Sequence, residues 1–248
     1  MSSKRVAVVT GAAGGLGESM CKALCEQGRA VVASYLLDEQ EQAREWQDRM
    51  KSEGCEVEIF ALDVSDFDSC QHFIDQVEEH VGPIDILVNN AGITRDAPLK
   101  RMGPEQWQAV MRTNLDSMFN MCQPLFDRMC SRGWGRIVNI SSLNGEKGQF
   151  GQANYSAAKA GIYGFTRAIA QEGARKGVTV NAVSPGYIDT PMVRQVPENV
   201  LEQIVAGIPV GRLGQPEEIA RAVAFLTDEN AGFITGTNLS VNGGQYMS

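Results

Sequence analysis

Short apolar runs of the kind that form buried strands alternate with longer amphipathic segments along the whole chain. The predicted strands are Val6–Val9, Ala30–Ser34, Val57–Leu62, Ile84–Asn89, Arg136–Ser141, Val178–Ser184 and Asn238–Val241. Helical patterns separate them at Gly17–Gln27, Glu39–Glu53, Asp68–His80, Pro104–Met129, Tyr155–Lys176, Pro197–Ala206 and Pro216–Leu226. Several strand runs are rich in Val and Ile, as in strands covered on both faces. This order predicts an α/β fold with a doubly wound, seven-stranded parallel sheet of Rossmann type.

A single domain accounts for this pattern. No composition break, repeat or linker divides the 248 residues, and a hydrophobic content of 43% suffices for one α/β core. We therefore expect residues 1–248 to form one domain. The least regular stretch spans about 185–213 and contains four prolines: Pro185, Pro191, Pro197 and Pro209. Long irregular segments in compact domains are often lids, so we predict a substrate flap there.

The charge of the chain limits its partners. A formal net charge of −8 argues against a basic face, so we expect neither nucleic acid nor an anionic membrane as a partner. The first residues, MSSKRVAVVTG, lead into a strand without a long apolar stretch. We therefore expect no signal peptide and no membrane span, and we expect a cytoplasmic protein.

The six cysteines form no CxxC pair, and the chain has only two histidines to complete a metal site. A structural zinc site needs closely spaced thiolates or histidines, so we predict no metal. We expect all six thiols to be reduced and mostly buried. They are Cys21, Cys25, Cys55, Cys70, Cys122 and Cys130.

A glycine-rich turn follows the first predicted strand and opens the first helix, with the sequence TGAAGGLG at residues 10–17. Glycines permit a tight turn and let backbone N–H groups approach a pyrophosphate at a helix N-terminus. The residues predicted to contact it are Gly11, Gly15, Leu16 and Gly17. The spacing TGxxxGxG differs from the usual GxGxxG and resembles that of the short-chain dehydrogenase/reductase family.

Later segments extend this resemblance, all at the carboxyl ends of predicted strands, where doubly wound sheets place ligands. Asp63-Val64 matches the family's adenine site, and NNAG at 89–92 matches the element beside the cofactor, which implies roles for Asn90, Ala91 and Gly92. The resemblance also implies that one segment holds the nicotinamide carboxamide. Its residues are Pro185, Gly186, Ile188 and Thr190.

Tyr155 and Lys159 lie four apart at the start of a predicted helix and therefore on one face. A phenol has a pKa near 10, and a neighbouring ammonium lowers it towards the working range of an acid–base group. This spacing alone is weak evidence. Ser142, at the end of the fifth strand, can donate to a carbonyl oxygen, and the resemblance gives Asn114 a water that completes a proton relay. The catalytic set we predict is Asn114, Ser142, Tyr155 and Lys159. By the resemblance, Tyr155 and Lys159 also contact the cofactor.

The choice between NADH and NADPH stays open. A carboxylate ending the second strand would bind the adenosine ribose and repel a 2′-phosphate, but Tyr35 occupies that place. Asp38, Glu39 and Glu41 make the region negative, and Arg44 is the nearest downstream cation. The local charge favours NADH, whereas the nearest relatives commonly use NADPH.

Within the family, the segments GQFGQ at 148–152 and SPGY at 184–187 resemble the acetoacetyl-CoA reductases of polyhydroxybutyrate synthesis. The resemblance implies an acyl-CoA substrate, a homotetramer and a pocket lined by Asp96, Ser142, Gln149, Phe150, Gln152 and Tyr187. Glutamine amides suit acyl and pantetheine carbonyls, and the two rings supply flat apolar walls. Candidate cations for the CoA phosphates, by position only, are Lys100, Arg101 and Arg194. Two alternatives remain: a 3-oxoacyl-acyl-carrier-protein reductase and a non-catalytic cofactor-binding sensor.

Overall fold

The structure is a computed structural model that describes residues 4–191 and 193–247. These residues contain a seven-stranded parallel sheet in the order β3-β2-β1-β4-β5-β6-β7. The order reverses direction between β1 and β4, which is the topological switch point where such sheets bind ligands. The predicted α/β class and strand count are confirmed. The strands are β1 (Val6–Val9), β2 (Ala30–Tyr35), β3 (Val57–Ala61), β4 (Ile84–Asn89), β5 (Gly135–Ile140), β6 (Val178–Pro185) and β7 (Asn238–Val241).

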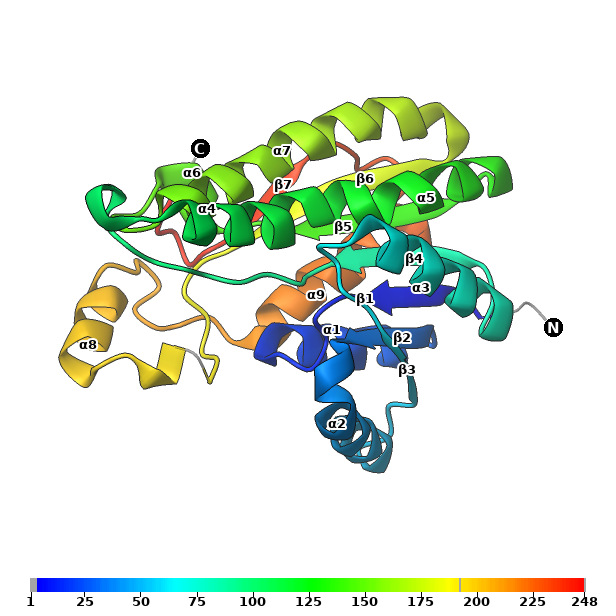
Figure 1. Ribbon diagram of the computed structural model, residues 1–248, viewed down its shortest axis with the longest axis horizontal. Helices are drawn as coiled ribbons and strands as arrows, with labels where there is room; N and C mark the ends of the chain where they lie inside the picture. Colours follow the sequence, from blue (N-terminus) through cyan, green and yellow to red (C-terminus); the bar gives the residue numbers. More distant parts are fainter. Residues whose placement is uncertain (1–3, 192, 248) are drawn as a thin grey trace.

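Helices cover both faces of the sheet and make a three-layered molecule (Figure 1). One layer holds α1 and α9, and the other holds α3, α5 and α7. No described helix has both the length and the apolar character needed to cross a membrane. The helices are α1 (Gly15–Glu26), α2 (Gln40–Ser52), α3 (Phe67–His80), α4 (Pro104–Met111), α5 (Ser117–Arg132), α6 (Leu143–Lys147), α7 (Ala153–Gly173), α8 (Glu198–Ala206) and α9 (Pro216–Leu226).

Alternate side chains of the central strands enter two separate apolar cores. Val9 of β1 packs with Leu24 of α1 and Val223 of α9, whereas Val8 packs with Phe73 of α3 and Leu125 on the opposite face. Because successive strand residues point to opposite faces, a strand buried on both sides can be apolar at every position. This explains why β1 lacks the polar alternation of a one-sided sheet.

Two predicted boundaries differ from the structure at places that matter for the site. The predicted helix Pro104–Met129 is interrupted by a π-helical turn at Arg112–Asp116. The predicted fifth strand ends at Ile140, and Ser142 instead caps α6, a short helix that the sequence pattern did not indicate. A wide turn and a five-residue helix are both too short to alter hydrophobic periodicity, so the pattern could not reveal them.

The expectation that all six cysteines are reduced is wrong for one pair. Cys25, near the end of α1, and Cys55, just before β3, form a disulfide with their Cα atoms 5.6 Å apart. The two residues are separated by 30 positions, and only the folded chain brings the end of α1 next to the residue before β3. Among the described residues Cys21, Cys70, Cys122 and Cys130 are free thiols, and no group of three or more His, Cys, Asp or Glu could hold a metal ion.

The segment predicted as a flap leaves β6 and returns before α9. Its two ends are bonded to each other, because Gly214 N donates to Tyr187 O and Asp189 N donates to Gly214 O, and Gly186 N donates to Val241 O of β7. Beyond them α8 contains no buried residue and projects from the end of the molecule (Figure 1). The contacts therefore divide the segment into an anchored base and an outlying helix.

Candidate active site

The predicted catalytic residues Ser142, Tyr155 and Lys159 meet where β5 ends and α7 begins. Three bonds fasten this strand end to α7. Lys159 Nζ donates to Ile140 O at 2.8 Å, Ser141 Oγ donates to Lys159 O at 2.8 Å, and Tyr163 Oη donates to Ser142 O at 2.9 Å. The relative position of Ser142 and Tyr155 is therefore set by backbone and side-chain contacts together.

The electrostatics of this cluster differ from the sequence expectation. Burial raises the pKa of Tyr155 above its ordinary value, and a hydrogen bond with Ser142 opposes this shift without reversing it. The net shift is thus upward, not downward as predicted, and the Lys159 ammonium, 5.6 Å from the centre of the Tyr155 ring, donates to Ile140 O and not to the phenol. Burial lowers the pKa of Lys159 to about 8. In the absence of ligands Tyr155 is thus a protonated phenol, and the nearby ammonium of Lys159 is destabilised by its burial.

Asn114 lies in the π-helical turn and is fully buried. Its Oδ1 accepts from Ile93 N at 2.8 Å, and its Nδ2 donates to Ile93 O at 2.9 Å. The side-chain amide of Asn114 thus pairs with both the N–H and the C=O of Ile93, in the loop that follows β4. A Cβ atom at Gly92 would lie 3.4 Å from Asn114 Oδ1 and 3.5 Å from Lys159 Nζ. The structure therefore brings Asn114, Gly92 and Lys159 together.

The glycine turn closes between β1 and α1 as predicted. A Cβ atom on Gly17 would lie 2.6 Å from Ala12 Cα, and one on Gly11 would lie 2.9 Å from Ala91 Cα. Gly11 also has a φ of +62°, which favours glycine. Gly14 caps α1 without a side-chain hydrogen bond, and within the described part of the chain no side chain satisfies the first N–H groups of this helix. Leu16 lies in the first turn, beside Gly15 and Gly17.

Asn90, Ala91 and Thr190, three of the other predicted cofactor residues, lie against this turn. Thr10 Oγ1 accepts from Asn90 N and Ala91 N, each at 3.0 Å, which holds the loop after β4 against the turn. A Cβ atom on Gly15 would lie 3.3 Å from Thr190 Cγ2, so the base of the flap segment also reaches the turn. The remaining predicted cofactor residues lie at the carboxyl ends of three strands. Tyr35 ends β2, Asp63 and Val64 come after β3, and Pro185 ends β6, with Gly186 and Ile188 just beyond it. One carboxylate oxygen of Asp63, Oδ1, already accepts hydrogen bonds from Ser65 N and Ser65 Oγ.

The predicted substrate residues form a looser group. Gln152 Nε2 donates to Asp96 Oδ2 at 2.8 Å, and Gln152 Oε1 accepts from Asn144 Nδ2 at 2.9 Å. Gln149 is bonded to Lys147 instead, and Phe150 is 87% exposed. In this structure Gln149 and Phe150 therefore do not line an enclosed pocket.

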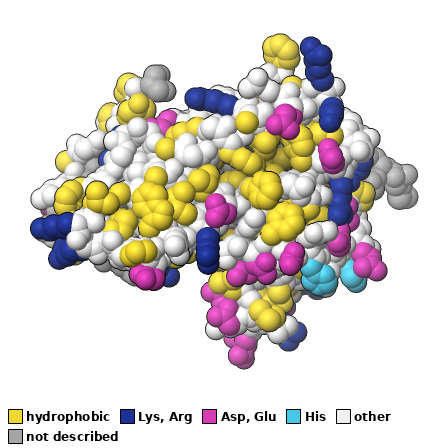
Figure 2. All heavy atoms as spheres, turned by 45° about the horizontal axis from the view of Figure 1, so that its top comes forward, with side chains coloured by type: hydrophobic (Ala, Val, Ile, Leu, Met, Phe, Trp, Pro, Cys, Tyr) yellow, Lys and Arg dark blue, Asp and Glu magenta, His cyan; other side chains and the backbone are white. Residues whose placement is uncertain are grey.

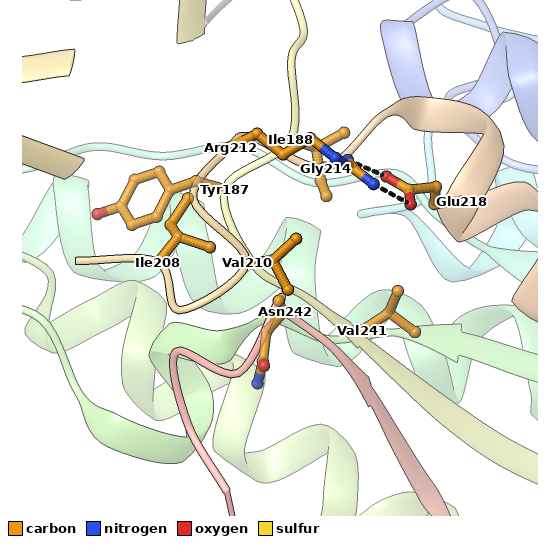
Figure 3. Close-up of a pocket in the computed structure, with 10 residues that line it drawn as sticks. Tyr187, Ile188, Ile208, Val210, Arg212, Gly214, Glu218, Val241 and Asn242 are labelled. Atoms are coloured by element: carbon orange, nitrogen blue, oxygen red, sulfur yellow. Dashed lines mark hydrogen bonds and ion pairs between the residues drawn. The ribbon is translucent and has the colours of Figure 1, made fainter. Parts of the chain in front are cut away.

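Tyr187 lies at the rim of a cavity of about 160 Å³ formed by the base of the flap segment and the end of β7 (Figure 3). Ile188, Val210 and Val241 line it, and its outer edge carries a two-bond ion pair between Arg212 and Glu218. The Tyr187 ring points away from that ion pair (Figure 3). The candidate CoA-binding cation Arg194 is paired with both oxygens of Asp189, and Lys100 and Arg101 are exposed.

Comparisons with known proteins agree with this geometry. The family model described as enoyl-(acyl carrier protein) reductase, which is a model of short-chain dehydrogenases and reductases, matches residues 11–245. The chain belongs to the short-chain dehydrogenase/reductase family. It is 56% identical to acetoacetyl-CoA reductase of Rhizobium meliloti over 98% of this chain and 99% of that one. It is 52% identical to acetoacetyl-CoA reductase of Allochromatium vinosum with the same coverage. A 3-oxoacyl-acyl-carrier-protein reductase of Pseudomonas aeruginosa is 43% identical over 98% of both chains.

As a member of this family the chain is an oxidoreductase that uses a nicotinamide cofactor. The residues at the carboxyl edge of the sheet fit such a cofactor. The uncapped N-terminus of α1 offers N–H donors for a pyrophosphate, and the missing side chain at Gly92 leaves room above Lys159. Glycines at 11 and 17 allow the turn to close as tightly as the structure requires.

The sequence did not predict a role for two residues near the site, Thr10 and Tyr163. Thr10 orients the loop after β4, and Tyr163 bonds the carbonyl of Ser142. A signal for Tyr163 was available: it follows Lys159 by four residues and Tyr155 by eight, so all three share one helix face. Its partners beyond Ser142 lie on other elements and left no pattern in the sequence.

Proposed function

We propose that this chain reduces acetoacetyl-CoA to (R)-3-hydroxybutyryl-CoA in polyhydroxybutyrate biosynthesis. The observation that carries the chemistry is the meeting of Ser142, Tyr155 and a buried Lys159 at one point of the sheet edge. The substrate is supported by full-length relatives that are named acetoacetyl-CoA reductases and are more than half identical to this chain.

The nicotinamide cofactor supplies the hydride that reaches the ketone carbon. Ser142 and Tyr155 donate hydrogen bonds to the ketone oxygen, and Tyr155 transfers its proton as that oxygen becomes an alkoxide. The raised pKa of Tyr155 suits a proton donor, because the phenol stays protonated at neutral pH. An alkoxide is more basic than a phenolate, so the transfer remains favourable. Lys159 stabilises the phenolate left behind, and Asn114 fixes the Ile93 carbonyl, which can hold a water that returns a proton to Tyr155.

We propose that the acyl-CoA chain binds over Asp96, Gln149, Phe150, Gln152 and Tyr187. The bond between Gln152 and Asp96 fixes the direction of one amide before the substrate arrives. The exposed ring of Phe150 gains an apolar partner when the thioester and Tyr187 lie against it. The outlying α8 closes over this group as a substrate flap.

The deciding experiment compares kcat/KM for acetoacetyl-CoA and for the acetoacetyl ester of acyl carrier protein. We expect the CoA ester to be the better substrate. Fast turnover of the carrier-linked ester with negligible turnover of the CoA ester would instead make the chain a 3-oxoacyl-acyl-carrier-protein reductase. Absence of turnover with both esters, together with tight cofactor binding, would indicate a sensor.

We expect NADH to be preferred over NADPH by about tenfold in kcat/KM, because a 2′-phosphate beside like charges is costly. Tyr35 is followed by Asp38 and Glu39 in the first turn of the next segment, both exposed. The check is kcat/KM for each cofactor at fixed ionic strength, with Asp38→Asn and the more distant Glu41→Gln as a matched pair. Asp38→Asn should narrow the preference and Glu41→Gln should leave it unchanged. A wild-type preference for NADPH would contradict this expectation.

The reductase activity should also fall as the pH rises. The pKa of Lys159 is about 8, so its ammonium is lost above that pH and can no longer stabilise the Tyr155 phenolate. We expect kcat/KM to decrease by about tenfold per pH unit well above pH 8, since this parameter reports the free enzyme. A pH profile that stays flat to pH 9.5 would show that Lys159 is not required as a cation.

We further propose a cytoplasmic homotetramer. Trp107 on α4 and Phe119 on α5 are 39% and 53% exposed, and apolar side chains spread over this face of the molecule (Figure 2). A second copy of the chain would bury them across a two-fold axis. Light scattering should give four times the monomer mass, and Phe119→Glu should lower that mass.

A further inference from the structure

A closed circuit of hydrogen bonds lies behind Ser142. Tyr163 Oη donates to Ser142 O at 2.9 Å and lies 2.9 Å from Ser184 Oγ on β6. Ser184 Oγ donates to Asn238 Oδ1 on β7 at 2.8 Å, and Asn238 Nδ2 donates to Glu146 Oε1 at 2.7 Å. Glu146 is on α6, the helix that Ser142 caps. The circuit therefore starts and ends at the same short segment, over the β5–β7 side of the sheet (Figure 1).

Proton counting gives this circuit a direction. As a carboxylate Glu146 can only accept, and it receives bonds from Asn238 Nδ2 and from Ser240 Oγ at 2.9 Å. The amide oxygen of Asn238 must then face Ser184, where it accepts a hydrogen bond from the single proton of the Ser184 hydroxyl. Ser184 has no proton left for Tyr163, so Tyr163 is the donor. Its single proton is shared between Ser184 Oγ and Ser142 O.

The carbonyl of Ser142 is held by two donors, Gly145 N at 2.9 Å and Tyr163 Oη. A backbone carbonyl fixed on both lone pairs fixes the rotation of its peptide plane and so the direction of the Ser142 side chain. That side chain also accepts from Asn144 N at 3.1 Å. Without the Tyr163 hydroxyl, Ile140 and Ser141 would keep their bonds to Lys159, but the Ser142 carbonyl would lose its bond to α7.

We propose that Tyr163, oriented through Ser184 and Asn238 by Glu146, is a positioning residue that holds Ser142 against the ketone oxygen and Tyr155. This inference rests on the proposed reductase function. Tyr163 touches neither substrate nor cofactor in this role. It acts only through the Ser142 carbonyl, so its removal should slow the chemical step while leaving cofactor binding intact.

The test measures kcat, the KM for acetoacetyl-CoA and the dissociation constant of NADH for Tyr163→Phe. We expect kcat to fall by about ten- to a hundredfold, as small displacements of a reacting group do. The dissociation constant of NADH should change by less than about twofold. Glu146→Leu should lower kcat less than Tyr163→Phe does, because the Tyr163 hydroxyl loses its fixed partner at Ser184 but can still donate to Ser142 O. Glu146→Gln should keep most of kcat because its amide oxygen still accepts from Asn238.

Thr166→Val is the matched control. Thr166 is buried on the same helix, and its hydroxyl accepts from Asn139 Nδ2 at 2.9 Å without a contact to the Ser142 segment. Its substitution removes a buried hydroxyl but should leave kcat within about twofold of wild type. Full kcat in Tyr163→Phe, or an equal loss in Thr166→Val at matched thermal stability, would overturn the inference. An inactive wild type would refute the proposed function instead, because wild-type turnover is measured first.

Discussion

Tyr155→Phe is expected to reduce kcat for acetoacetyl-CoA by about 10²- to 10⁴-fold, the range that a positioned proton donor supplies. The change removes only the hydroxyl that donates the proton and keeps the ring that packs at the start of α7. Binding of NADH should be close to that of wild type, since Lys159 and the glycine turn remain. Stopped-flow or steady-state assays of kcat, with fluorescence titration of NADH, provide the two measurements.

The same substitution at Tyr246 serves as the control. Tyr246 lies in the C-terminal segment, and among the described residues its hydroxyl forms no hydrogen bond, so Tyr246→Phe should be fully active. If Tyr155→Phe kept a tenth or more of wild-type kcat, the assignment of the proton donor would be wrong. If it lost NADH binding as well, the Tyr155 hydroxyl would be needed to bind the cofactor and not only to donate the proton.

The sheet could be predicted from the sequence because its strands are buried on both faces. Short, mostly apolar runs such as Val6–Val9 and Ile84–Asn89, alternating with helical patterns, are typical of the strands of a parallel sheet. The glycine turn was predictable for a related reason: at Gly11 and Gly17 no Cβ atom fits. Residues that satisfy a steric requirement leave a visible pattern.

The features that were missed depend on contacts between helices and strands, and the sequence does not show which side chains meet in these contacts. Cys25 and Cys55 carry no spacing signal, so their disulfide was missed. The ammonium of Lys159 was expected to act on Tyr155, yet in the folded chain it donates to Ile140 O, and burial dominates the pKa of Tyr155. Helix spacing places two side chains on one face but does not say which neighbour each will bond.

Lys159→Met should have opposite effects on activity and on stability. We expect kcat/KM to fall by about 10²- to 10³-fold, because the phenolate of Tyr155 loses its only nearby cation on α7. We expect the free energy of unfolding at pH 7 to rise by about 1–2 kcal/mol. A pKa of about 8 in place of 10.5 means that burial of this ammonium costs the folded state about 3 kcal/mol. The lost bond to Ile140 O offsets about 1 kcal/mol of the gain.

The pH dependence of stability tests this account of Lys159 independently of activity. Its folded-state pKa lies below its unfolded value, so between about pH 8 and 10.5 the unfolded chain binds more protons. Wild-type stability therefore gains from this group as the pH rises through that window, and the Met variant lacks the gain. The stability difference between the two proteins, measured by urea unfolding, should shrink from pH 8 to pH 10.5. A difference that stays constant, or a Met variant less stable at pH 7, would mean that the buried ammonium is well compensated and that Lys159 is kept for folding as much as for chemistry.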